Sequence, residues 1–213
     1  MGENNLISIL ISSVSFVVSV VALYFSQLRR AKIDIIAGEL LNINHFAEGN
    51  CGITLAVSIA NRGAIPTTVR RLGLLVQKPG SKEGYLMEPL YYQKIDQAGN
   101  FLHDTPPGPI AVAGGKSETR QVLFRSSFER PDEFTFTRPG EYNFTVLAWI
   151  KESVEPQAGD SFLVELSEQS AAQLDQWRKE KNTMTERVRR FEWKKWEAHK
   201  LTEVEVAALN RPN

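Results

Sequence analysis

The chain opens with a long stretch of uncharged residues. Positions 6–25 read LISILISSVSFVVSVVALYF, and a helix of this length, at about 1.5 Å per residue, matches the roughly 30 Å hydrocarbon core of a bilayer. The serine hydroxyls can bond to backbone carbonyls four residues earlier, which lowers their cost in lipid. A buried core helix and a cleavable signal peptide are the alternatives. The leader MGENN carries no Lys or Arg and no Ala-x-Ala precedes Ser26, so the pattern favours an uncleaved, single-pass signal-anchor.

After residue 32 the hydrophobic period changes from helical to two. Residues 53–60 alternate large apolar side chains with small or polar ones, and residues 142–150 place Tyr142, Phe144 and Val146 on one face. The same reading predicts six short strands, at 32–41, 53–60, 67–77, 119–124, 142–150 and 161–166. Because no amphipathic helix separates them, an all-β, antiparallel sandwich is expected rather than a parallel α/β sheet.

A local motif resembles a known family of β-sandwiches. Residues 138–144 read RPGEYNF, a Pro-Gly turn followed by a tyrosine two residues into an alternating strand. This resembles the tyrosine corner of immunoglobulin-like and fibronectin-like domains, in which the phenol bonds back to the backbone at the corner. The resemblance implies an immunoglobulin-like β-sandwich over residues 33–167. Phe144 stands where an antibody-type domain has its second disulfide cysteine, so a disulfide-bonded antibody domain is not implied.

The segment 78–112 is long for a loop and rich in aromatic residues. Segments beyond roughly 12–15 residues without secondary structure are uncommon in compact domains. Two interpretations stay open: an extra hairpin that covers a sheet edge, or a surface that binds a partner protein through aromatic and methionine anchors. The candidate partner contacts in this segment are Tyr85, Met87, Tyr91, Tyr92 and Phe101.

The C-terminal part has helix-start signals and a basic composition. Capping boxes at Ser170 and Thr183 predict helices over 171–181 and 184–200, or one helix bent near Asn182. Residues 178–200 hold nine Lys/Arg and four Glu, a net charge of +5, whereas residues 33–167 hold twelve basic and sixteen acidic residues, a net of −4. Docking on the sandwich, a partner helix and the membrane surface are the alternatives for this tail, and Trp193 and Trp196 are further candidate partner contacts. Nucleic-acid binding is disfavoured because the whole chain has no net charge.

These patterns divide the chain into three parts. Residues 1–32 form an N-terminal tail, transmembrane helix and basic flank, residues 33–167 the β-sandwich, and residues 168–213 a helical tail. Arg29, Arg30 and Lys32 follow the span while only Glu3 precedes it, so the N-terminus is expected outside and the bulk of the chain in the cytoplasm. The single cysteine, Cys51, follows Gly49-Asn50 and is expected in a solvent-exposed turn.

Composition and motif searches indicate no catalytic or metal site. One cysteine and three histidines show no ligand spacing, and Gly114-Gly115-Lys116-Ser117 lacks the upstream glycine and the following helix of a P-loop. No enzyme activity and no cofactor are therefore expected. The expected function is a non-catalytic, membrane-anchored accessory or scaffold protein that presents a cytoplasmic β-sandwich for protein–protein interaction. The alternatives are an extracytoplasmic, membrane-anchored ligand-binding module and an enzyme with an unrecognised site.

Overall fold

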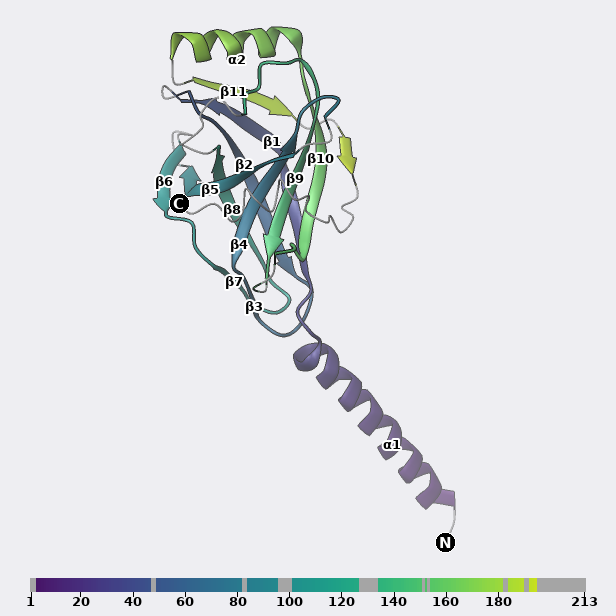
Figure 1. Cartoon of the computed structure of the whole chain (residues 1–213). Helices are drawn as coiled ribbons and strands as arrows, with labels where there is room; N and C mark the ends of the chain where they lie inside the picture. Colours follow the sequence, from purple (N-terminus) through teal and green to yellow (C-terminus); the bar gives the residue numbers. More distant parts are fainter. Residues whose placement is uncertain are drawn as a thin grey trace.

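The computed structural model shows a mostly antiparallel β core with one apolar helix at its N-terminus. Helix α1 projects away from one end of the core, and helix α2 lies across the opposite end (Figure 1). The structure describes residues 3–46, 49–81, 84–95, 101–126, 134–150, 152, 154–181, 184–189 and 192–194.

The structure contains the predicted N-terminal helix and strands in all six predicted regions, together with strands that the alternation did not predict. Helix α1, Glu3–Leu23, continues into a π-helical turn, η1, Tyr24–Leu28, and helix α2 spans Glu168–Glu180. The strands are β1 Ile33–His45, β2 Cys51–Asn61, β3 Thr67–Val69, β4 Arg71–Gln77, β5 Gly84–Ile95, β6 Phe101–Thr105, β7 Ile110–Val112, β8 Ser117–Arg125, β9 Gly140–Trp149, β10 Ala158–Leu166, β11 Met184–Arg189 and β12 Glu192–Lys194.

One bent sheet forms the core and almost closes on itself. Its strand order is β11-β1-β2-β8-β5-β4-β9-β10-β12, with β6 paired to β5, and β3 pairs separately with β7. Strand β5 joins the two halves because residues 84–87 pair with β4 and residues 88–93 pair with β8. The buried Asp160 carboxylate of β10 accepts a hydrogen bond from the Ala37 N–H of β1 at 2.7 Å, which brings the two halves together in a near-barrel.

Period-two alternation correctly predicted which side chains face the core. Ile53, Leu55, Val57 and Ile59 of β2 are all 0% exposed. On β9, the Tyr142 hydroxyl donates to the Arg138 carbonyl oxygen at 2.8 Å, which is the corner bond that the RPGEYNF motif predicted. Burial raises the pKa of Tyr142 to about 12. The aromatic rings of Phe144 and Phe162 stack at 5.5 Å across β9 and β10.

The region predicted as one strand at 67–77 is divided into two. Arg70 separates β3 from β4, and its N–H donates to the Trp149 carbonyl oxygen at 2.7 Å. Strand β3 pairs with β7 near the base of α1, whereas β4 pairs with β9 in the main sheet. The β-branched and aliphatic composition predicted extended structure correctly but carried no signal for the change of partner.

The segment 78–112 folds as a hairpin, but not as a cover for a sheet edge. Strands β5 and β6 pair with each other, and β5 occupies a central position between β8 and β4. Pro89 lies beside a register shift between β5 and β8. A bulge of this kind lets a strand accept a proline, which cannot donate to the ladder.

The predicted helical tail is correct for its first part only. Helix α2 begins three residues before the predicted start, because Ser167 Oγ, rather than Ser170, caps the helix by accepting from the Ser170 N–H at 3.1 Å. The second predicted helix, 184–200, is wrong over its described residues: 184–189 form β11 and pair with β1, and 192–194 form β12 and pair with β10. Both strands add to open edges of the sheet, and this tertiary pairing overrides local helix propensity.

The turn prediction for Cys51 is also wrong. Cys51 is the first residue of β2, is 3% exposed, and its thiol contacts the Phe134 carbonyl oxygen at 3.1 Å. Burial raises the pKa of this thiol from its ordinary value of 9.0 to about 12. The thiolate, which is the reactive form, is therefore disfavoured at neutral pH.

Candidate functional site

Helix α1 exposes large apolar side chains along its length. From Ile7 to Leu28 the large apolar side chains are 47–69% exposed, and residues 7–28 form a helix that is long and apolar enough to cross a membrane. Ser13 and Ser19 donate to the carbonyl oxygens of Ile9 and Ser15, each at 2.8 Å, as the sequence predicted. A polar side chain satisfied by its own helix is compatible with a lipid environment.

The end of α1 is tied directly to the β core. Arg29 leaves the helical conformation, and its carbonyl oxygen accepts from the N–H groups of Ala64 at 2.8 Å and Ile65 at 3.2 Å. The Lys32 carbonyl oxygen accepts from the Arg62 N–H at 2.8 Å. The linker 29–32 is therefore hydrogen-bonded to the loop 61–65, and these bonds restrict its movement relative to the β core.

Asn61 is the centre of this junction. Its side chain is 2% exposed, and its Oδ1 accepts from the N–H groups of Gly63 at 2.9 Å and Lys32 at 3.3 Å. Its Nδ2 donates to the carbonyl oxygens of Ile65 at 2.9 Å and Val112 at 3.4 Å. One buried amide thus bonds the linker, the β2–β3 loop and the end of β7. In the sequence, Asn61-Arg62-Gly63 has the composition of a break after a strand, and nothing in it indicates this role.

Two glycines let the backbones of the junction approach each other. A Cβ on Gly63 would lie 2.1 Å from the Arg30 carbonyl oxygen, and one on Gly114 would lie 1.8 Å from the Ala64 carbonyl oxygen. Both distances are far inside van der Waals contact, so neither position has room for a side chain. Gly114 and Gly115 form a turn, and strand β8 follows it in place of the helix that a P-loop requires.

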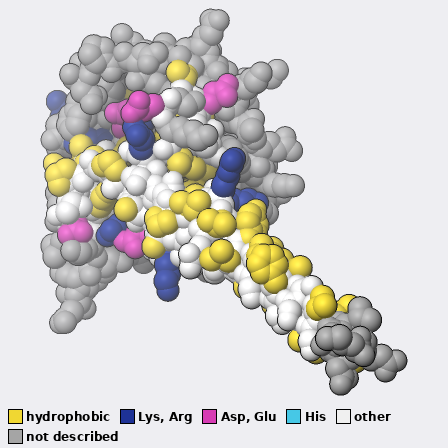
Figure 2. Space-filling view, turned by 90° about the horizontal axis from the view of Figure 1, so that it is seen from below, with side chains coloured by type: hydrophobic (Ala, Val, Ile, Leu, Met, Phe, Trp, Pro, Cys, Tyr) yellow, Lys and Arg dark blue, Asp and Glu magenta, His cyan; other side chains and the backbone are white. Residues whose placement is uncertain are grey.

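Basic side chains surround the junction. Seen from below, hydrophobic atoms continue from the helix onto the underside of the β core, with Lys and Arg side chains and some Asp and Glu side chains around them (Figure 2). Arg29, Arg30, Lys32 and Lys116 are exposed in this region. Arg62 is exposed as well, but it forms an ion pair with Asp34.

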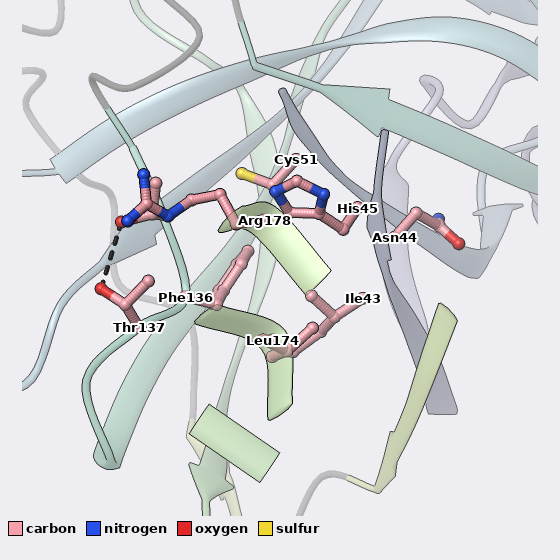
Figure 3. A pocket seen from close by; sticks show the side chains of 9 residues that line it. Ile43, Asn44, His45, Cys51, Phe136, Thr137, Leu174 and Arg178 are labelled. Atoms are coloured by element: carbon pink, nitrogen blue, oxygen red, sulfur yellow. Dashed lines mark hydrogen bonds between the residues drawn. The ribbon is translucent and has the colours of Figure 1, made fainter. Parts of the chain in front are cut away.

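A small cavity lies at the other end of the core, beneath α2. It is enclosed by strands β1 and β2, residues 135–137 and the α2 side chains Leu174 and Arg178 (Figure 3). It has room for about one water molecule, whereas pockets that bind small molecules measure roughly 300–1,000 Å³. Cys51 and His45 both reach this cavity, but its walls are mainly apolar. The cavity is a packing feature and not a ligand site.

Two of the predicted partner contacts are buried in the core. Met87 is 0% exposed and Tyr92 is 7% exposed, with the Tyr92 hydroxyl donating to the Gly108 carbonyl oxygen at 2.8 Å. Partner contact is not supported for these two, because β5 is a central strand and buries them. Tyr85 is partly buried beside Phe134, with ring centroids 5.1 Å apart.

Tyr91 is the remaining candidate of this segment with a described side chain, and it is half-buried. Phe101 lies on β6 and Trp193 on β12, where the structure describes the backbone alone. Trp196 lies outside the described residues. For Tyr85, Tyr91, Phe101, Trp193 and Trp196, partner contact stays a prediction.

Within the described part of the chain, no three His, Cys, Asp or Glu side chains gather as metal ligands would.

No protein-family model and no curated protein matches the chain. A β-glucosidase from Listeria innocua, solved in complex with glucose, aligns at 15% identity and a TM-score of 0.34, covering 64% of this chain and 16% of its own. The sporulation control protein Spo0M of Bacillus subtilis aligns at 13% identity and a TM-score of 0.30, covering 64% of this chain and 49% of its own. The chain thus spans less than half of either protein, and likeness at this level carries no function across.

Proposed function

We propose that this chain is a non-catalytic, membrane-anchored accessory or scaffold protein. In this proposal α1 crosses a bilayer once, and an immunoglobulin-like sandwich on its cytoplasmic side binds another protein. The observation that carries the proposal is the surface of α1, whose apolar side chains are 47–69% exposed over 7–28. Exposure of this much contiguous apolar surface in water is unfavourable, and a lipid environment removes the penalty.

The sandwich part of the proposal rests on strand order and on one hydrogen bond. Strands β1, β2 and β8 lie together in one half and β4, β9 and β10 in the other, as in the two sheets of immunoglobulin-like domains. The Tyr142–Arg138 bond at the start of β9 supports the same assignment. The cytoplasmic side is supported by Arg29, Arg30 and Lys32 at the end of the span.

Insertion is tested by placing two charges inside α1. In Val14→Glu/Val18→Glu, carboxylates enter the middle of the span, so the protein should leave the membrane fraction that resists alkaline carbonate extraction. Val154→Glu is the matched control, because Val154 is 55% exposed on the β core and the same change should leave the protein in that fraction. Carbonate extraction of the unaltered chain would refute the anchor.

Orientation is tested with a cysteine placed at the α2 end. Cys51 is buried and does not report on sidedness, so a membrane-impermeant maleimide should label Gln169→Cys selectively. Labelling is expected only after gentle permeabilisation, whereas Asn4→Cys, before the span, should label in intact cells. The reverse pattern would favour the extracytoplasmic ligand-binding module.

Partner binding is tested with two adjacent tyrosines on β5. Tyr91→Ser should reduce recovery of a partner from native membranes in mild detergent and leave the melting temperature nearly unchanged. Tyr92→Ser should lower the melting temperature, because Tyr92 is buried and bonded to Gly108. If Tyr91→Ser lowers the melting temperature equally, Tyr91 belongs to the core and not to a partner surface.

A further inference from the structure

One large apolar side chain is exposed at the place where α1 meets the β core. Ile65 is 42% exposed, and its N–H donates to the carbonyl oxygen of Arg29, the first residue beyond the helix. Ile65 is therefore held beside the end of the apolar helix by a direct backbone bond. A bilayer that contains α1 has its interface at this level of the molecule.

The junction keeps Ile65 at this level. The linker is bonded on both sides of Ala31, through the Arg29 and Lys32 backbones, and Asn61 bonds both Lys32 and Ile65. Gly63 lies so close to the linker that a methyl group would not fit. Since a domain tied in this way does not swing freely, the same underside faces the membrane whenever α1 is inserted.

The charge of the underside matches an anionic surface. Arg29, Arg30, Lys32 and Lys116 are exposed, and the Lys116 carbonyl oxygen accepts from the Asn61 N–H at 2.9 Å, which places Lys116 in the same junction. The acidic Asp34 nearby is paired with Arg62. Lys and Arg next to a span attract anionic lipid headgroups within about a Debye length.

On the basis of the proposed membrane anchor, we infer that the underside of the β core binds the surface of the bilayer that α1 crosses. Ile65 enters the boundary between headgroups and acyl chains, and Arg29, Arg30, Lys32 and Lys116 contact anionic headgroups. An apolar side chain within a basic cluster is the composition of interfacial contacts. The sandwich is thereby held against the membrane in one orientation, with α2 farthest from it (Figure 1).

The test uses the full chain in vesicles with a fluorescent probe on Ala113→Cys, an exposed position in the loop that precedes Lys116. The control probe is on Gln169→Cys, in α2 at the opposite end. A nitroxide on the lipid headgroup should quench the Ala113 probe and spare the Gln169 probe. Replacing part of the phosphatidylcholine with phosphatidylserine should raise quenching at Ala113 about twofold at low salt, and salt should reverse the rise.

Two further variants separate binding from mere proximity. Ile65→Ser and Lys116→Gln change exposed side chains, so the melting temperature should stay constant while the response to phosphatidylserine falls about twofold. A phosphatidylserine response that neither variant alters, or equal quenching at both probes, would overturn the inference. Flotation of the same vesicles tests the anchor separately. If the protein floats with the vesicles but shows no response to phosphatidylserine, only the inference is refuted. If the protein does not float, the membrane anchor is refuted as well.

Discussion

The two ends of the β core are joined to their helices by different physical means. At the α1 end, one buried amide, several backbone hydrogen bonds and two glycines without space for a side chain fix the linker. At the α2 end, Ala171 and Leu174 pack on the core beside a cavity of about one water molecule. Hydrogen bonds and close backbone contacts fix the direction in which a helix leaves the core, whereas apolar packing mainly determines which part of the core the helix covers. The orientation relative to the core is therefore fixed more strongly for α1 than for α2.

The largest effect is expected for Asn61→Ala. The change removes four hydrogen bonds and leaves the N–H groups of Gly63 and Lys32 without their side-chain acceptor. The free energy of unfolding should fall by about 3 to 4 kcal/mol, measured by denaturant titration in detergent. Asn143→Ala is the matched control: its Nδ2 makes one bond, to Gln77 Oε1 at 2.8 Å, and its loss should cost about 1 kcal/mol.

Gly63→Ala should follow, with a loss of about 2 to 3 kcal/mol. The added methyl group meets the Arg30 carbonyl oxygen, and the linker has to move to accept it. Gly108→Ala is the control, because a Cβ there meets no atom within 4 Å. Equal melting temperatures for the two variants would show that the linker can move to accept a side chain at position 63. The α1 end would then be no more rigidly joined to the core than the α2 end.

Leu174→Ala tests the opposite end. Leu174 is 3% exposed and lines the cavity, so truncation should cost about 2 kcal/mol, near the lower limit for buried leucines, because α2 can settle onto the core. Hydrogen exchange should increase in α2 and stay unchanged in the junction loops. Increased exchange at both ends would mean that the two ends unfold as one unit.

Tyr142→Phe is expected to cost about 1 kcal/mol, the net value of one hydrogen bond, since the ring keeps its place in the core. The melting temperature should fall slightly at neutral pH. Tyr92→Phe removes an equivalent bond, from Tyr92 to the Gly108 carbonyl oxygen, and serves as the comparison. A much larger loss for Tyr142→Phe would show that the corner bond also directs folding.

The last prediction concerns Cys51→Ala and is tested by the pH dependence of stability in alkali. Burial raises its folded-state pKa from 9.0 to about 12, so the folded state holds the thiol proton more tightly than the unfolded state. This contribution to stability is present below pH 9 and is lost as the pH rises toward 12. Cys51→Ala should therefore make the fall in melting temperature between these pH values less steep, and an unchanged slope would assign the fall to other groups.

Alternation along the chain was enough to predict the six strand regions and the buried faces of β2 and β9. It did not predict β5, because Pro89 and the adjacent bulge break the alternation, and because the burial of Leu86 and Met87 on opposite faces depends on both halves of the sheet. Residues 184–189 and 192–194 have a helix-like local sequence, and their extended structure is explained by pairing with the open edges of β1 and β10. The role of Asn61 is equally non-local, since its four partners come from three separate segments.

Among the strands that the structure describes, β11 and β12 come last in the chain, yet they pair with β1 and β10 at the two edges of the sheet. During synthesis, both sides of the emerging sheet stay without these partners until the last strands leave the ribosome. Unpaired strand edges are sites of aggregation. Premature termination after α2 should therefore yield a chain that self-associates through β1 and β10, even though its hydrophobic core is already encoded.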